Sequence, residues 1–124
     1  MENPIKISVI IPVYNGEPYI KKCLDILMKQ DFDKLYEIIV VDDASTDKSK
    51  EIIKKFKLPN LKLYSLSSNS GQSAARNLGL RKALGEYIYF QDVDDTISIK
   101  SLKTLYTIAK QHNCDFVCSD FQRV

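Results

Sequence analysis

The sequence predicts an α/β fold with three layers, in which helices cover both faces of a mostly parallel sheet. Two observations lead to this prediction. Short apolar runs alternate with segments whose apolar residues recur at helical spacing. The first run, residues 6–13, is almost continuously apolar, as expected for a strand buried on both faces. Such alternation implies right-handed crossovers and one compact α/β/α unit over residues 1–124.

The strand segments are short and each ends at turn-forming or polar residues. Asn15-Gly16 follows the first strand, Asp42-Asp43 follows the second, and the polar loop 67–71 follows the third. The expected strands are residues 6–13, 37–41, 61–66, 86–91 and 115–119. There is no internal repeat and no linker, so the chain is expected to form a single domain.

Four helices are expected between these strands, each with an apolar stripe. They cover about residues 17–30, a segment capped by Ser45 or Thr46 and ended by Pro59-Asn60, about residues 72–83, and a segment capped by Ser98. The residues expected to face inward are Ile20, Cys23, Leu24, Leu27, Met28, Ile52, Ile53, Phe56, Ala75, Leu78, Gly79, Leu102, Leu105, Tyr106 and Ala109.

Composition narrows the class of protein. The chain is 44% hydrophobic and 27% charged, and its net charge of +2 does not indicate a nucleic-acid partner. No run approaches the roughly 20 apolar residues of a membrane span. Cys23, Cys114 and Cys118 have neither a disulfide framework nor a zinc pattern, so they are expected to be reduced, buried thiols. A cytoplasmic protein is expected.

Acidic residues collect at the ends of two strands. In an open parallel sheet, ligands bind beyond the carboxyl ends of the strands. With the common strand order 3-2-1-4, the second and fourth strands flank the first. Five carboxylates are therefore expected at one edge of the sheet, near residues 12–15: Asp42, Asp43, Asp92, Asp94 and Asp95.

Carboxylates at this density require an opposing cation or hydrogen-bond donors. Mg²⁺ or Mn²⁺ fits better than zinc, and such ions take part of their shell from substrate phosphates. Asp92 and Asp94 are two apart and would face the same way on an extended segment, with Val93 in the core. Of Asp42 and Asp43, only one is expected to reach the pocket, while the other holds a loop amide or a helix start.

Several other kinds of functional site are excluded because the sequence lacks the motifs that they require. No Gly-x-Gly-x-x-Gly follows the first strand, and no Gly-x-x-x-x-Gly-Lys-Ser/Thr occurs. The only histidine, His112, is expected at a helix end on the surface. A phosphorylation-switched receiver domain would need its acidic pair after the first strand and a lysine after the fifth. A sugar nucleotidyltransferase would need a Gly-rich basic loop after the first strand, where residues 14–17 read Tyr-Asn-Gly-Glu.

Four ordered blocks closely resemble family 2 glycosyltransferases. They are residues 8–15 (SVIIPVYN), 37–47 (EIIVVDDASTD), 69–79 (NSGQSAARNLG) and 85–95 (GEYIYFQDVDD). The resemblance extends from residue 7 to about residue 110. It implies a Rossmann-like GT-A fold, an activated sugar donor that is commonly a UDP-sugar, and inversion at the anomeric carbon.

The resemblance also assigns roles around a base and ribose pocket. The resemblance implies that the pocket is lined by Pro12, Tyr14 and Glu17. Asp43 would accept a hydrogen bond from the base, as suits the imide N–H of uracil. Arg76 falls near the same pocket, although a structural salt bridge to Asp42 or Asp43 is an equal alternative.

Asp92 and Asp94 match the family's Asp-x-Asp motif. The resemblance implies that Asp94 holds the divalent metal and that Asp92 holds the ribose or a water on that metal. Asp95 is either a further ligand or a structural acceptor.

No catalytic base is identifiable in this chain. In the family, the acceptor-binding half and its Asp or Glu base follow the Asp-x-Asp motif at a distance that places them beyond Val124, and neither Asp115 nor Asp120 fits. The chain is therefore expected to bind a donor but to transfer slowly or not at all to a glycan or lipid-linked acceptor. A non-catalytic sugar-nucleotide module stays open as an alternative. Peripheral attachment of a longer parent to the inner membrane face would depend on later segments.

Overall fold

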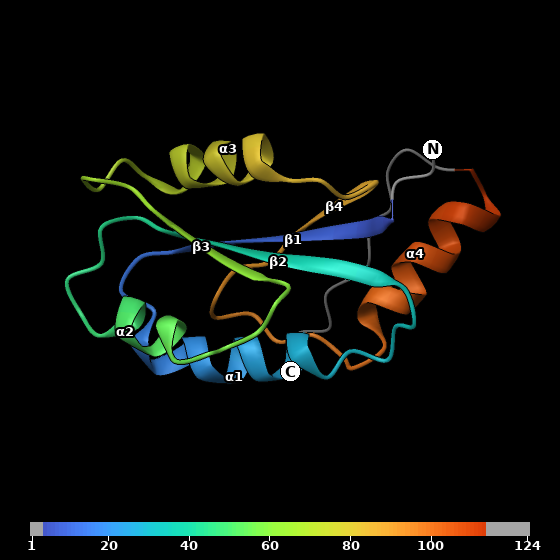
Figure 1. Ribbon diagram of the computed structural model, residues 1–124, viewed down its shortest axis with the longest axis horizontal. Coiled ribbons are helices and arrows are strands. Elements are labelled where there is room, and N and C mark those ends of the chain that lie inside the picture. Colours follow the sequence, from blue (N-terminus) through green and yellow to red (C-terminus); the bar gives the residue numbers. More distant parts are fainter. Residues whose placement is uncertain (1–3, 114–124) are drawn as a thin grey trace.

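The computed structural model describes residues 4–113, in which strands and helices alternate strictly (Figure 1). The elements are β1 (Ile5–Val13), α1 (Glu17–Met28), β2 (Leu35–Asp42), α2 (Ser49–Lys54), β3 (Leu61–Ser65), α3 (Gln72–Lys82), β4 (Tyr87–Phe90) and α4 (Ser101–Gln111). The strand expected at 115–119, and Cys114 and Cys118, lie outside the described residues. The other expected strands and helices are all present.

The sheet has the order β3-β2-β1-β4, as the sequence predicts, and its pairings are parallel. Val13 at the end of β1 pairs with Asp42 at the end of β2. On the other side of β1, Ile10 pairs with Phe90, the last residue of β4. The loops that follow these three strands therefore leave the sheet at one edge.

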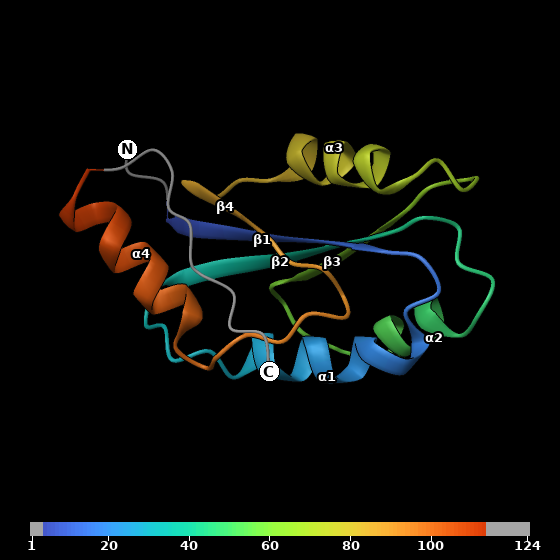
Figure 2. The same ribbon diagram turned by 180° about the vertical axis from the view of Figure 1, so that it is seen from behind.

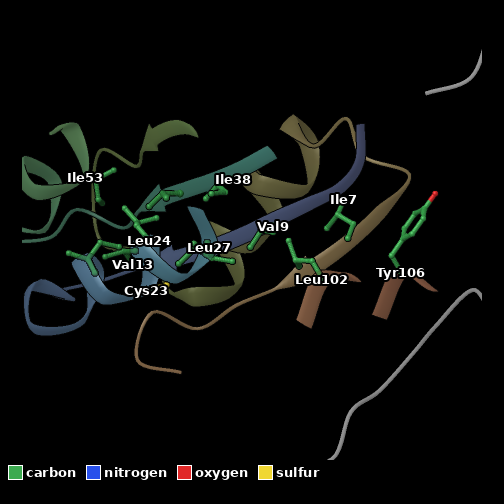
Figure 3. Packing of buried hydrophobic residues seen from close by; sticks show 13 residues of the cluster. Ile7, Val9, Val13, Cys23, Leu24, Leu27, Ile38, Ile53, Leu102 and Tyr106 are labelled. Atoms are coloured by element: carbon green, nitrogen blue, oxygen red, sulfur yellow. The ribbon is translucent and has the colours of Figure 1, made fainter. Parts of the chain in front are cut away.

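Helices cover both faces of the sheet. Figures 1 and 2 place α3 on one face and α1 and α2 on the other. The larger core cluster lies on the α1 side, where side chains of β1 such as Val9 and Val13 meet Leu24 and Leu27 of α1 (Figure 3). Leu102 of α4 joins the same cluster. A smaller cluster of Ile39, Val41 and Ala75 lies under α3.

Three local predictions are wrong, and each has a physical reason. Helix α2 begins at Ser49, because the Ser45 and Thr46 side chains bond to the loop after β1 instead of capping it. Lys100, not Ser98, is the N-cap of α4, since Ser98 Oγ accepts from the Lys100 N–H in the preceding turn. Met28 is 38% exposed at the end of α1 and does not belong to the inward stripe.

Cys23 is a free, buried thiol, as expected.

Within residues 4–113, every helix is too short or too polar to pass through a bilayer.

Candidate functional site

A pocket of about 370 Å³ opens at the edge where β1, β2 and β4 end. Its residues come from four parts of the chain that the sheet brings together: the end of β1 and start of α1, the end of β2, the start of α3, and the loop after β4. The lining residues are Pro12, Val13, Tyr14, Asn15, Gly16, Tyr19, Asp43, Gln72, Asp92, Val93 and Asp94. Five of the eight predicted site residues thus line one cavity, and the other three, Glu17, Arg76 and Asp95, do not.

Asp43 lies in this pocket and is only 3% exposed. Its Oδ1 accepts a hydrogen bond of 2.7 Å from the Ser70 N–H, and its Oδ2 accepts one of 2.9 Å from the Gly71 N–H. Gly71 has φ of 95°, which a residue with a side chain rarely adopts. Asp43 therefore holds the turn from which α3 starts.

Asp42 is also buried but does not line the pocket. Its Oδ2 accepts a hydrogen bond of 3.2 Å from the Ser45 N–H. Ala44, the residue before Ser45, has a left-handed φ of 58°. Only one member of the pair reaches the pocket, as expected, and the other holds a loop amide.

The three acids after β4 lie on a turn, not on the extended segment that the sequence suggested. The Asp95 N–H donates to the Asp92 carbonyl at 3.1 Å, and the buried Gln91 side chain donates to the carbonyls of both residues. Val93 packs against the core, as expected. Because the chain turns here, Asp92, Asp94 and Asp95 can each bring one carboxylate oxygen within 4.8 Å of the others.

The acidic turn carries excess negative charge. Partial burial, and then the charges of Asp92 and Asp94, raise the pKa of Asp95 above its usual value. The nearby Cys23 has its pKa raised to about 12, mainly by burial and then by Asp95 and Asp94. Its thiol therefore stays neutral, which leaves an all-oxygen ligand set suited to a hard divalent cation.

Arg76 pairs with Asp92, which corrects the alternative of a bridge to Asp42 or Asp43. The guanidinium NH2 group lies 3.0 Å from Asp92 Oδ1. Gln72, one turn earlier on α3, donates to the same oxygen through Nε2 at 3.0 Å. Helix α3 thus holds the Asp92 carboxylate through its Oδ1.

Of the other predicted residues, Pro12 and Tyr14 line the pocket and Glu17 does not. The Glu17 carboxylate accepts a hydrogen bond of 3.2 Å from the Lys48 N–H, so it faces the loop before α2. Sequence reasoning missed Tyr19 and Gln72 as lining residues. The sequence did contain a signal for Gln72. It follows a glycine at the start of a helix, and such a position faces the edge of the sheet where the strands end.

A second hollow of about 420 Å³ adjoins the pocket between α1 and the segment after β4. It shares Tyr19, Val93 and Asp94 with the first pocket, so Asp94 lies where the two meet.

Comparison with known proteins gives consistent matches. The family model described as "Glycosyl transferase family 2" matches residues 8–124. "Glycosyltransferase GlyA" of Streptococcus pneumoniae is 44% identical over 117 residues, which cover 94% of this chain and 17% of that protein. The poly(ribitol-phosphate) beta-N-acetylglucosaminyltransferase TarS of Staphylococcus aureus is 43% identical over 114 residues, which cover 90% of this chain and 20% of TarS.

Solved structures show the same likeness. Residues 1–349 of S. aureus TarS in complex with UDP superpose with a TM-score of 0.82 at 44% identity, over 88% of this chain and 33% of that one. The Pyrobaculum calidifontis mannosyltransferase PcManGT, in complex with GDP-Man and Mn²⁺, superposes with a TM-score of 0.67 at 37% identity, over 72% and 27%. The chain spans about a fifth of the length of the curated relatives named above.

Proposed function

This chain belongs to glycosyltransferase family 2 and has the GT-A fold of that family, and we propose that it is the donor-binding part of an inverting glycosyltransferase. The donor would be a nucleoside-diphosphate sugar with UDP as its nucleotide. The cofactor would be Mn²⁺ or Mg²⁺, and the acceptor a hydroxyl group of a glycan or lipid-linked glycan.

The observation that supports this most is that Asp43 and the Asp92–Asp94 turn line the same pocket. A nucleoside diphosphate has the matching chemistry, with N–H donors on its base and negative charge on its phosphates. Among the solved relatives, TarS is in complex with UDP, and PcManGT is in complex with GDP-Man and Mn²⁺. These ligands were observed in the relatives, and they favour the same class of ligand for this chain.

At the base end, Pro12 and Tyr14 would line the nucleoside and Asp43 would accept its imide N–H. Each Asp43 oxygen already accepts one backbone N–H and retains a second lone pair for this bond. The two backbone bonds hold the carboxylate still before the ligand arrives, which lowers the cost of ordering it.

At the phosphate end, Asp92, Asp94 and Asp95 would hold the cation. The cation, when bound, would neutralise the charge that develops on the departing diphosphate. Arg76 and Gln72 would keep Asp92 oriented, and Arg76 adds one positive charge beside this acidic turn.

We assign donor binding to the described residues, and we assign none of residues 4–113 as the catalytic base. TarS acts on poly(ribitol-phosphate) according to its name, and the acceptor of the present protein would be of the same broad kind, a polymer with free hydroxyls.

Calorimetric titration with UDP, GDP and dTDP, each with and without Mn²⁺, tests the proposal. We expect UDP to bind most tightly, and Mn²⁺ to strengthen its binding by about tenfold or more. Asp94→Ala should remove the effect of Mn²⁺ while the circular dichroism spectrum stays that of the wild type.

Asp33→Ala is the matched control, because Asp33 is an exposed acid just before β2, at the opposite end of the sheet. It should bind UDP and Mn²⁺ like the wild type. Equal UDP affinity with and without Mn²⁺, or an Asp94→Ala variant that still responds to Mn²⁺, would contradict the proposed metal site.

A further inference from the structure

The loop after β1 is joined to the loop after β2 through Asn15. This residue has a left-handed φ of 51°, a conformation that asparagine tolerates better than most residues. Asn15 lines the pocket between Tyr14 and Gly16, yet its side-chain oxygen is occupied by groups from the other loop.

Three donors converge on Asn15 Oδ1. They are the Thr46 N–H at 2.8 Å, the Asp47 N–H at 3.3 Å and the Thr46 hydroxyl at 3.3 Å. In the opposite direction, the Asn15 N–H donates to Ser45 Oγ at 3.0 Å. We refer to these four bonds as the Asn15 clasp.

Two further bonds run alongside the clasp. The Glu17 N–H donates to Asp47 Oδ2 at 3.1 Å, and the Lys48 N–H donates to the Glu17 carboxylate. Although slight burial raises it, the pKa of Asp47 is lowered overall by hydrogen bonds from Ser49 and from the Glu17 N–H. Asp47 therefore stays ionised and keeps accepting these bonds at neutral pH.

On its other side, the same loop packs against the acidic turn. A Cβ added to Gly16 would lie 3.1 and 3.2 Å from the two methyl groups of Val93. That spacing is tighter than ordinary contact, so the backbone at Gly16 rests directly on the residue between Asp92 and Asp94. The loop is thus held between the β2 loop and the acidic turn.

We propose that Asn15 is a positioning residue of the donor site. Its clasp holds the segment from Tyr14 to Gly16 in place, and this sets the separation between the base end of the pocket and the acidic turn. The inference rests on the proposed function, and it adds that nucleotide affinity depends on a side-chain oxygen that faces away from the nucleotide. We expect the cation to bind Asp92, Asp94 and Asp95 without the clasp, because none of its four bonds involves these acids.

Three variants of the full chain separate the hydrogen bonds from the backbone conformation. Asn15→Gly keeps the left-handed backbone and loses the acceptor. Asn15→Asp keeps both the acceptor and a residue that tolerates this φ. Asn113→Gly is the matched control, because Asn113 also has a left-handed φ, of 50°, but follows α4 and does not line the pocket.

The measurements are UDP affinity in the presence of Mn²⁺, Mn²⁺ affinity without nucleotide, and hydrogen exchange of the Thr46 and Asp47 amides in the ligand-free chain. For Asn15→Gly we expect UDP affinity to fall about tenfold, Mn²⁺ affinity to stay within about twofold, and both amides to exchange faster. Asn15→Asp should recover most of the lost affinity, and Asn113→Gly should match the wild type throughout.

The outcomes distinguish this inference from the proposed function. A wild-type chain that binds no UDP overturns the proposed function itself. Wild-type UDP binding that Asn15→Gly leaves unchanged overturns only the role of Asn15. An Asn15→Asp variant as weak as Asn15→Gly also overturns it, because an acceptor oxygen at position 15 would then be present without restoring UDP affinity.

Discussion

Asp42 and Asp43 are adjacent and both buried, but their carboxylates have different numbers of partners. Both oxygens of Asp43 accept backbone N–H groups, from Ser70 and Gly71. Asp42 accepts one, from Ser45, and its Oδ1 has no hydrogen-bond partner among the described residues. Hydrogen bonds from backbone N–H groups to a carboxylate are stronger than neutral ones. Asp43 should therefore contribute more to stability than Asp42.

Replacing each residue by asparagine tests this difference. Asp43→Asn should lower the free energy of unfolding by about 1–3 kcal/mol, because the new amide NH₂ would face a backbone N–H that loses its acceptor. Asp42→Asn should cost less, since one oxygen is enough for the Ser45 N–H. Urea unfolding followed by circular dichroism measures both, and equal losses would contradict the argument.

Helix α3 packs closely against the sheet, and its small residues allow this. A Cβ at Gly79 would lie 2.5 Å from Ile10 Cγ2 on β1, and Ala75 is fully buried on the same side. The same helix presents Gln72 and Arg76 to Asp92. Its distance from β1 therefore also determines where Asp92 is held.

Gly79→Ala tests the close packing of α3. We expect it to lower the free energy of unfolding by about 1–3 kcal/mol through overpacking, although alanine is the better helix former by about 1 kcal/mol. Asn77→Ala, at an exposed position of the same helix, should be neutral or slightly stabilising. Thermal and urea unfolding of both variants provide the comparison. A stabilised Gly79→Ala chain would show that helix and sheet separate easily.

Across the molecule, buried carboxylates lie at both ends of the sheet with different roles. At the end opposite the pocket, the Glu37 side chain is 3% exposed and accepts hydrogen bonds from Ser8 Oγ at 2.6 Å and the Leu84 N–H at 2.7 Å. Its other oxygen accepts from Lys62 Nζ at 2.9 Å. Glu37 thus links β1, β2, β3 and the connection from α3 to β4.

The Glu37 network predicts a pH dependence of stability. Burial raises the pKa of Glu37, but the bonds from Ser8, Leu84 and Lys62 outweigh it and hold that pKa below its ordinary value of 4.5. A lowered pKa means that this stabilisation is present above about pH 4.5 and is lost as the pH falls through the folded-state pKa. Glu37→Gln should therefore be less stable at neutral pH and show a shallower stability loss between about pH 5 and 3. Urea unfolding across that range measures it, and parallel curves for variant and wild type would contradict it.

Much of this architecture was predictable from local pattern. The apolar runs around Val9 and Val40 mark buried parallel strands, and the apolar stripe with Leu24 marks a covering helix. Strand order and the edge where Asp43 and Asp94 meet then follow from general rules of parallel sheets. The strands and helices themselves depend on hydrophobic periodicity, which each segment contains independently of the rest.

The choice of side-chain partners was not predictable in this way. Arg76 bonds Asp92 and not the acids after β2, Glu17 faces the loop before α2, and the Asp92 segment turns instead of extending. These outcomes depend on loop dihedrals and on hydrogen bonds between residues far apart in the chain. Such bonds can form only after the sheet has brought these loops together. The local sequence pattern therefore places the acids at one edge of the sheet, and the tertiary structure decides which hydrogen-bond partner each acid has.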